Sequence, residues 1–465
     1  MDKTKGQELM EKLSYTPLNT CEELSESELK AVDAWCEGYK KFLDNAKTER
    51  EAVTEAVKML KEDGYEEFDR EKNYKAGDRV YYNNRGKSLV IATIGTEPIK
   101  NGTRVVVAHI DSPRMDLKPV PLYEADELAL FKTHYYGGIK KYQWTAIPLA
   151  LHGVLIRRDL STVTVSIGED ESDPVFVVTD LLPHLGQEQG KRTLNEGIKG
   201  EELNVLIGSR PFKDDKVSEK VKLNILNILF EKYGIIESDF LSAELEVVPA
   251  FKARDIGFDR SLIGAYGHDD RVCAYPAVMA ALQVKNPKYT CVTILADKEE
   301  VGSDGNTGMN SAFFRFFIAD LAKMQGVEVG TVLSNSQCLS ADVNAAFDPT
   351  FPDVMEKKNA SFINRGVVIT KYTGSRGKSG TSDASAEFMG RVRKLLDENK
   401  VIWQIGELGK VDMGGGGTVA KYVANQNLDV VDLGVPVLSM HAPFEVISKT
   451  DVYMAYRAFE CFLKD

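Results

Sequence analysis

Apolar runs that end in polar side chains constrain the fold of this chain more than any other feature. The run 291–296 consists mainly of β-branched and aliphatic residues, which is typical of a buried strand. Asp297 and the pair Glu299-Glu300 follow it. In an open α/β sheet, ligands bind beyond the carboxyl ends of the strands, where two neighbouring carboxylates repel each other unless a cation or a proton intervenes. One glutamate could bind a metal there while the other acts as general base, although most Glu-Glu pairs are solvated surface residues.

A second apolar run, 103–108, ends at His109, and Asp111 lies two residues further on. Residues i and i+2 of an extended chain point the same way, so Asp111 could hold His109 in place or act on a metal from behind it. A single histidine at a strand end is more often a structural residue than a ligand. This run therefore indicates a metal site only if other candidate ligands lie near it.

The composition is that of a globular protein without a membrane segment. The chain has 465 residues, 43% of them hydrophobic and 28% charged, and this length suggests two domains. No apolar run approaches the roughly 20 residues of a membrane span, and no apolar signal segment follows the N-terminus. The cysteines form no CxxC pair, which disfavours disulfides and zinc-thiolate sites and fits a cytoplasmic location. The net charge of −12 argues against nucleic acid as a partner, and we expect no membrane partner.

The order of the predicted elements indicates an α/β domain interrupted by a β-rich insertion. Helices are expected over the first sixty or so residues, where Ser25–Glu28 and Thr48–Glu51 have the capping-box spacing. Short alternating segments dominate 118–248, with one helix near 217–233. We therefore predict a discontinuous α/β catalytic domain, 1–117 and 249–465, around an inserted domain, 118–248.

The remaining elements repeatedly place polar residues at their ends. We predict strands at 79–82, 88–92, 366–370, 401–405 and 435–441, the last of which ends in His441. A helix is predicted to open at His268-Asp269-Asp270, where acidic residues also suit the helix dipole, and another to span about 311–325. The glycine-rich loop 410–418 permits close backbone approach, but it lacks the GK[ST] ending of a phosphate loop.

Histidines and carboxylates at the ends of these elements form one candidate metal site. Its members are His109, Asp269, Glu299, Glu300, Asp342 and His441. Two histidines with several carboxylates suit zinc, cobalt or manganese, and the absence of cysteine ligands disfavours a purely structural zinc site. Two ions about 3.5–4 Å apart need a bridging carboxylate, which one aspartate can supply.

Several sequence blocks resemble the aspartyl aminopeptidase (aminopeptidase I) family of dizinc peptidases. They are AHIDSPRMDLKP, GHDDRVCAYPA, DKEEVGSDGNTGM, SADVNAAFDPTFPD, KYTGSRGKSG and LSMHAPFEV, and the resemblance spans roughly residues 80 to 465. It implies a zinc-peptidase α/β domain with a doubly wound mixed sheet and an inserted β-rich dimerisation domain. It also implies assembly of dimers into a tetrahedral homododecamer and the release of N-terminal residues, typically acidic ones, from peptide substrates.

The resemblance also implies a role for each candidate residue. One zinc would be held by His109 and Asp342, and the other by Glu300 and His441. Asp269 resembles the bridging aspartate, because the family pattern is a ligand Asp followed by Asn or Asp, and Asp270 fills that second place. Glu299 resembles the general base of the family. Asp111 resembles the family residue that is positioned behind the histidine ligand, here His109.

Specificity for an acidic first residue requires a cation in the side-chain pocket, because a buried unpaired carboxylate is costly. The candidates are Lys410, which precedes the glycine run, together with Lys378 and Arg376. Each is more often a solvated surface charge, and the 414–417 loop departs from animal members of the family. The alternatives are an aminopeptidase of neutral preference, a related dizinc deacylase or carboxypeptidase, and a non-catalytic assembly or carrier protein. The intact Glu299-Glu300 pair and both histidines argue against the last.

Overall fold

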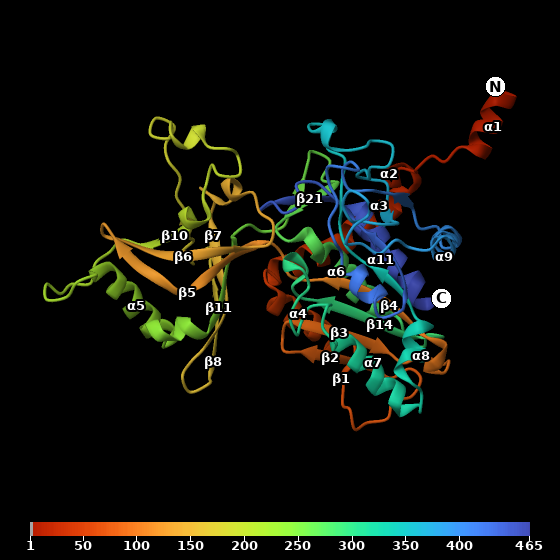
Figure 1. The fold of residues 1–465 in the computed structure, drawn as a ribbon, viewed down its shortest axis with the longest axis horizontal. Coiled ribbons are helices and arrows are strands. Elements are labelled where there is room, and N and C mark those ends of the chain that lie inside the picture. Colours follow the sequence, from red (N-terminus) through yellow and green to blue (C-terminus); the bar gives the residue numbers. More distant parts are fainter. Residues whose placement is uncertain (1–2) are drawn as a thin grey trace.

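The computed structural model describes residues 3–465, which form two main β-sheets lying side by side (Figure 1). The larger sheet has nine strands in the order β1 (Glu66–Glu67), β2 (Arg79–Asn84), β3 (Ser88–Thr93), β14 (Thr290–Ala296), β4 (Thr103–His109), β15 (Gln337–Ser340), β19 (Asp429–Gly434), β17 (Val367–Thr370) and β18 (Trp403–Ile405). Strand β14 is parallel to β4 and antiparallel to β3. This mixed sheet confirms the predicted α/β fold class.

Helices cover both faces of the nine-stranded sheet. Val105 and Val107 of β4 pack in a core that includes residues of α7 and α8, whereas Val106 and Ala108 pack in a core with α3, α6 and α11. Both faces of the strand are therefore buried, which explains why its sequence is continuously apolar rather than alternating. The helices are α1 (Lys5–Leu13), α2 (Thr20–Glu23), α3 (Glu26–Asn45), α4 (Glu49–Glu62), α5 (Lys220–Tyr233), α6 (His268–Gln283), α7 (Phe313–Met324), α8 (Val329–Ser334), α9 (Ala386–Glu398), α10 (Ala420–Ala424) and α11 (Lys449–Lys464).

The N-terminal helices begin where their caps predict. Ser25 accepts a hydrogen bond from the backbone of Glu28 at the start of α3, and Thr48 does the same for Glu51 at the start of α4. In both boxes the glutamate returns a hydrogen bond to the cap backbone, so the two capping-box predictions are confirmed. Helix α1 projects from the body of the molecule (Figure 1). None of the helices within residues 3–465 combines the length and apolar composition needed to cross a membrane.

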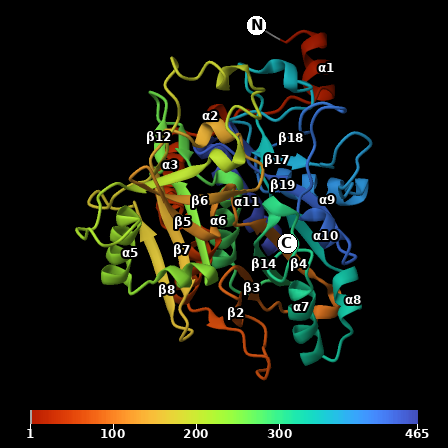
Figure 2. The same cartoon turned by 60° about the vertical axis from the view of Figure 1, so that its left-hand side comes forward.

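The second sheet has seven strands and its own core. Its order is β8 (Thr162–Ile167), β7 (Leu149–Ile156), β11 (Ala243–Pro249), β5 (Arg114–Ala125), β6 (Leu128–Tyr136), β10 (Asn204–Gly208) and β9 (Val177–Val178). The buried Trp144 and Phe131 belong to its core, and α5, near the predicted helix at 217–233, packs against it. The first and last strands of the sheet in chain order, β5 and β11, begin at Arg114 and end at Pro249, so they extend beyond 118–248 on both sides. Figure 2 shows α5 on the flank of this sheet that is turned away from the nine-stranded sheet.

Two small sheets complete the fold and correct one prediction. They consist of β12 (Arg254–Ile256), β13 (Leu262–Ala265) and β21 (Glu445–Ser448), and of β16 (Asn344–Ala345) with β20 (Pro436–Val437). The predicted strand 435–441 is wrong, because regular pairing ends at Val437 and His441 lies in a turn. Ser439 and His441 both have positive φ values, 57° and 65°, which reverse the chain toward β21.

Candidate active site

One half of the candidate site lies at the carboxyl ends of three adjacent parallel strands, β14, β4 and β15. The register pairs Ala296 of β14 with His109 of β4, and Ser340 of β15 with Val107. Their carboxyl ends therefore lie together. His109 closes β4, the short 3₁₀ helix Glu299–Val301 follows β14, and Asp342 follows β15.

The other half comes from the small sheet of β13 and β21. Its register pairs Ala265 with Glu445, which brings the start of α6 next to the turn at His441. The buried Glu445 carboxylate accepts the backbone N–H of Asp269 at 3.0 Å and that of His441 at 2.7 Å. Glu445 therefore fixes these two residues relative to each other.

The two histidines face opposite oxygens of Asp269. Nδ1 of His109 contacts the Asp111 carbonyl at 2.9 Å, and Nδ1 of His441 contacts the Gly138 carbonyl at 2.7 Å. A carbonyl only accepts, so both Nδ1 atoms carry the proton and both Nε2 atoms are free to bind a metal. Nε2 of His109 lies 3.1 Å from Oδ1 of Asp269, and Nε2 of His441 lies 3.2 Å from its Oδ2.

A further carboxylate accompanies each histidine. Oδ1 of Asp342 is 3.8 Å from Nε2 of His109, and Oε2 of Glu300 is 3.6 Å from Nε2 of His441. Two sets of three residues could each hold a metal ion, because the possible ligand atoms within each set all lie within 4.8 Å of one another. One set is His109, Asp270 and Asp342, and the other is His109, Asp269 and Glu300. Oδ2 of Asp270 also accepts the backbone N–H of His109 at 3.3 Å, whereas its Oδ1 is buried without a hydrogen bond.

The site has more acidic side chains than histidines, so bound cations would balance its charge. Its buried or nearly buried acidic side chains outnumber its two histidines: Asp269, Asp270, Glu299, Glu300 and Asp342. Burial, followed by the charge of Asp269, raises the pKa of Glu300 well above its ordinary value. Oδ1 of Asp269 and Oε1 of Glu300 are buried without a hydrogen bond. Unpartnered carboxylate oxygens beside free imidazole nitrogens fit a zinc-binding site.

Glu299 lies beside these possible ligands and lines the same cavity. Burial, followed by the charge of Asp342, raises the pKa of Glu299 to about 8, and a bound cation would lower it again. Oδ1 of the buried Asp111 accepts the backbone N–H of Glu299 at 3.1 Å, and its Oδ2 accepts that of Glu300 at 3.2 Å. Asp111 thus holds the turn that carries both glutamates.

A cavity of about 500 Å³ opens onto the site. Glu299, Glu300, Asp269, Asp342 and His441 line it, together with glycines 415–417 and Tyr422. Lys421 is the one lysine or arginine among the described residues that line it. The predicted cations Arg376, Lys378 and Lys410 instead line a neighbouring hollow of about 380 Å³, which shares Thr373 and Leu408 with the cavity.

Sequence reasoning missed three residues of the site. Glu445 lies in the block LSMHAPFEV, but a single glutamate four residues after a histidine has no distinctive pattern. Lys421 follows the glycine run on the short helix α10, where a lysine is ordinarily a surface residue. The Gly138 carbonyl belongs to the chain just after β6 of the seven-stranded sheet, and no side-chain motif marks it.

Comparison with known proteins identifies the family of the chain. The aminopeptidase I zinc metalloprotease (M18) family matches residues 42–463. A probable M18 family aminopeptidase 1 of Clostridium acetobutylicum is 51% identical over 96% of this chain and 98% of its own length. A crystal structure of an M18 aminopeptidase from Thermotoga maritima is 46% identical, with a TM-score of 0.93 over 97% of this chain and 100% of that one. The S. cerevisiae mApe1 dodecamer, at 21% identity and a TM-score of 0.75, covers 94% of this chain and 97% of that one and shares the fold. The resemblance predicted from the sequence blocks is confirmed, and the chain belongs to the M18 family of aminopeptidase I zinc metalloproteases, a family of hydrolases.

Proposed function

We propose that this aminopeptidase uses two zinc ions per subunit to remove the first residue of peptides. The observation that carries the proposal is the position of Asp269, whose two oxygens face different histidines. His109, Asp269 and Asp342 would hold one ion, and Asp269, Glu300 and His441 the other. Two ions in such sites lie about 3.5–4 Å apart and share a bridging carboxylate. Cobalt or manganese would suit the same donors.

Glu299 is the proposed general base. Zinc held by these residues would supply a Lewis acid for the scissile carbonyl and would make a nearby water more acidic. Glu299 lines the cavity, where it would accept the proton of the attacking water and pass it to the leaving amine. Asp111 orients this base through the backbone N–H of Glu299.

The acidic lining of the cavity favours a free N-terminus on the substrate. A free α-amine could bind one of the proposed ions or donate a hydrogen bond to a carboxylate of the cavity that is not a proposed ligand, whereas a blocked N-terminus lacks the free amine. This difference supports aminopeptidase activity over the release of C-terminal residues.

The preference for an acidic first residue, as part of this proposal, is assigned to Lys421. Its ammonium lies 5.4 Å from the centre of the Tyr422 ring, and the Tyr422 hydroxyl donates to the Gly302 carbonyl at 2.9 Å. This contact ties α10 to the turn that carries Glu299. Lys378, by contrast, pairs with Asp383 at 2.9 Å and lies over the Tyr372 ring at 3.8 Å, outside the cavity. Lys421 is therefore better placed than Lys410, Lys378 or Arg376 to meet the side chain of the substrate.

Assembly and location complete the proposal. We propose a catalytic domain, 1–117 and 249–465, and an inserted dimerisation domain, 118–248, through which dimers form a tetrahedral dodecamer. The dodecameric fungal relative supports this arrangement. All six cysteines are unpaired, which fits the reducing cytoplasm.

Two neighbouring substitutions test the proposed chemistry. Glu299→Gln should retain zinc but lose turnover, by about 10²–10⁴-fold, because only the proton acceptor is removed. Glu300→Gln should lose zinc as well as turnover, because a ligand is removed. Zinc per chain and the hydrolysis of aminoacyl reporter substrates separate the two outcomes. Turnover near the wild-type value in Glu299→Gln would contradict the assignment of the base.

A further inference from the structure

Tyr136, the last residue of β6, and the two glycines that follow it reach the proposed metal ligands. The Tyr136 hydroxyl, at the end of β6, donates a hydrogen bond to Oδ2 of Asp111 at 2.8 Å. A Cβ atom added to Gly137 would lie 3.2 Å from Oε2 of Glu300. The Gly138 carbonyl contacts Nδ1 of His441 at 2.7 Å. The segment 136–138 therefore lies against both glutamate-bearing and histidine-bearing parts of the site.

We propose that Tyr136 is a positioning residue of the catalytic centre and that the segment 136–138 makes the inserted sheet part of the active site. This inference rests on the proposed function, because it assigns to Tyr136 the task of holding Asp111 behind the base and the ligand His109. Tyr136 does not line the substrate cavity; it lines a separate polar hollow of about 260 Å³.

Asp111 is the residue through which Tyr136 acts. Its carboxylate accepts the backbone N–H groups of Glu299 and Glu300, and its Oδ1 lies 3.3 Å from Nδ1 of His109. The Tyr136 hydroxyl is the side-chain donor on the opposite side of this buried group. Without it, Oδ2 loses a charge-assisted hydrogen bond and keeps only the N–H of Glu300. The carboxylate is then held less firmly, which would let the base and the imidazole shift together.

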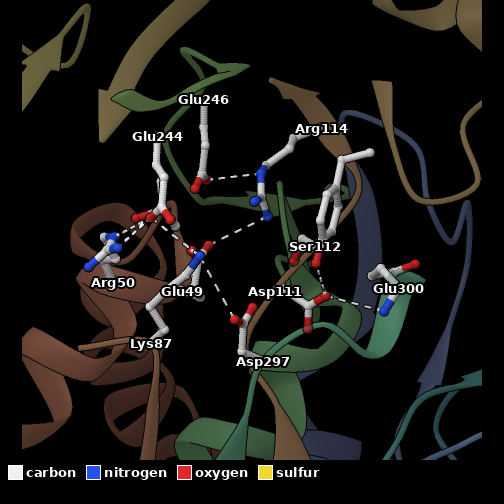
Figure 3. Close-up of polar contacts among 12 residues, drawn as sticks. Glu49, Arg50, Lys87, Asp111, Ser112, Arg114, Glu244, Glu246, Asp297 and Glu300 are labelled. Atoms are coloured by element: carbon white, nitrogen blue, oxygen red, sulfur yellow. Dashed lines mark hydrogen bonds and ion pairs between the residues drawn. The ribbon is translucent and has the colours of Figure 1, made fainter. Parts of the chain in front are cut away.

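The Tyr136 ring is itself held by a buried charge network. Arg114 lies directly opposite Tyr136 in the β5–β6 register, and its guanidinium is 3.9 Å from the centre of the ring. Arg114 contacts Glu246 at 3.1 Å and Glu49 at 3.5 Å, as Figure 3 shows beside Asp111 and Glu300. These contacts connect the ring to α4 and to β11.

The same network reaches the strand that carries the base. Lys87 lies 3.2 Å from Glu49 and 4.0 Å from Asp297, the residue that follows β14 (Figure 3). Lys87 thus supports the turn that carries Glu299 at Asp297, and Asp111 supports the same turn at its backbone. Tyr136 contacts Asp111 through its hydroxyl. Its ring contacts Arg114, which shares the partner Glu49 with Lys87.

A glycine is required at position 137 for this approach. Gly137 has a φ of 71°, a left-handed conformation that side chains disfavour, and a Cβ atom there would lie 3.2 Å from Oε2 of Glu300. A larger residue at position 137 would press on this proposed ligand. At Gly138 a Cβ atom would lie 3.4 Å from Nδ1 of His441, which is an ordinary contact distance.

The test compares Tyr136→Phe with Tyr135→Phe. Tyr135 is the preceding residue of β6 and is 41% exposed, so its loss of a hydroxyl is a matched control. Tyr136→Phe should lower kcat by about 10–100-fold, the effect typical of residues behind metal ligands, and leave KM unchanged. The midpoint of thermal unfolding should stay near that of Tyr135→Phe. A merely structural role would instead lower the midpoint and leave kcat per folded molecule unchanged.

A second measurement does not depend on activity. After replacement of zinc by cobalt(II), the visible absorption bands report the geometry of the ligands, and they should shift in Tyr136→Phe but not in Tyr135→Phe. Equal kcat values and identical spectra for the two variants would overturn the inference. If wild-type enzyme does not hydrolyse aminoacyl substrates, the proposed substrate fails, while the cobalt spectra still decide the role of Tyr136.

Discussion

His152 of the seven-stranded sheet contacts one carboxylate of helix α4 and one that follows β8. Its Nδ1 lies 2.7 Å from Oε1 of Glu51, and its Nε2 lies 3.1 Å from Oε1 of Glu169. Glu51 is also the capping-box residue of α4, since its Oε2 accepts the N–H groups of Lys47 and Thr48. Burial lowers the pKa of His152, but the hydrogen bonds to Glu169 and Glu51 outweigh it and raise the pKa to about 9.

This shift sets the sign and size of a pH effect on stability. The pKa of His152 is raised on folding, so its contribution is fully present below the unfolded pKa of about 6.5 and is lost as pH rises through 9. With a folded pKa of about 9, the contribution to the free energy of unfolding is about 3 kcal/mol at pH 6, about 2 kcal/mol at pH 7.5 and less than about 1 kcal/mol at pH 9. The side chain is 2% exposed, so solvent screens this interaction little.

Urea unfolding of His152→Gln and wild-type protein between pH 6 and 9 measures this contribution directly. The difference in free energy of unfolding should fall by between 2 and 3 kcal/mol, roughly, across this range. His184→Gln, which alters an exposed histidine of the 180–196 loop, should show no such pH-dependent difference. A His152→Gln difference that is the same at pH 6 and pH 9 would refute the ion-pair reasoning.

Three further predictions concern the metals, the specificity and the assembly. Asp269→Ala should reduce zinc at both sites, whereas His441→Ala should mainly reduce it at one; elemental analysis that finds two tightly bound ions in Asp269→Ala would contradict the bridge. Lys421→Ala should lower the rate on Asp and Glu substrates relative to Leu by about 10–100-fold, since hydrogen bonds to charged groups contribute about 1.5–3 kcal/mol, and Lys410→Ala should not; an unchanged ratio in Lys421→Ala counts against its role. Light scattering should find dodecamers, and monomers at every concentration with zinc present would exclude the proposed assembly.

The sequence predicts best those parts of the fold that local chemistry determines. The caps Ser25 and Thr48 specify helix starts because their hydrogen bonds involve residues three positions away. The apolar runs ending at His109 and Ala296 specify strands because both faces of the sheet are covered. The run 435–441 is mostly apolar and therefore also suggests a strand, but the chain turns at His441. This turn leads into β21, which pairs with β13, a strand far away in the sequence.

The candidate site follows the same division. His109, Glu299, Glu300 and Asp342 lie at the carboxyl ends of neighbouring strands, so a general rule about α/β sheets brings them together. Lys421 could not be predicted, because its place in the cavity depends on how the glycine loop and α10 fold back toward Gly302. The sequence places the loops of Lys410, Lys378 and Arg376 correctly beside the cavity, but it does not show that these three residues line the neighbouring hollow.

The inserted sheet is connected to the active site by its position in the chain. The chain leaves the nine-stranded sheet at His109 and enters β5 at Arg114, and it leaves β11 at Pro249 and passes through β13 before it reaches Asp269. One crossing between the sheets therefore begins at the proposed ligand His109, and the other leads to the proposed ligand Asp269. Any tilt of the inserted sheet would move the segment 136–138 relative to Asp111 and His441, which it contacts. A buried charge network around Arg114 and Glu49 opposes such a tilt, because separating its partners would leave charges buried and unpaired. The orientation of the two sheets and the geometry of the catalytic residues are thus physically coupled.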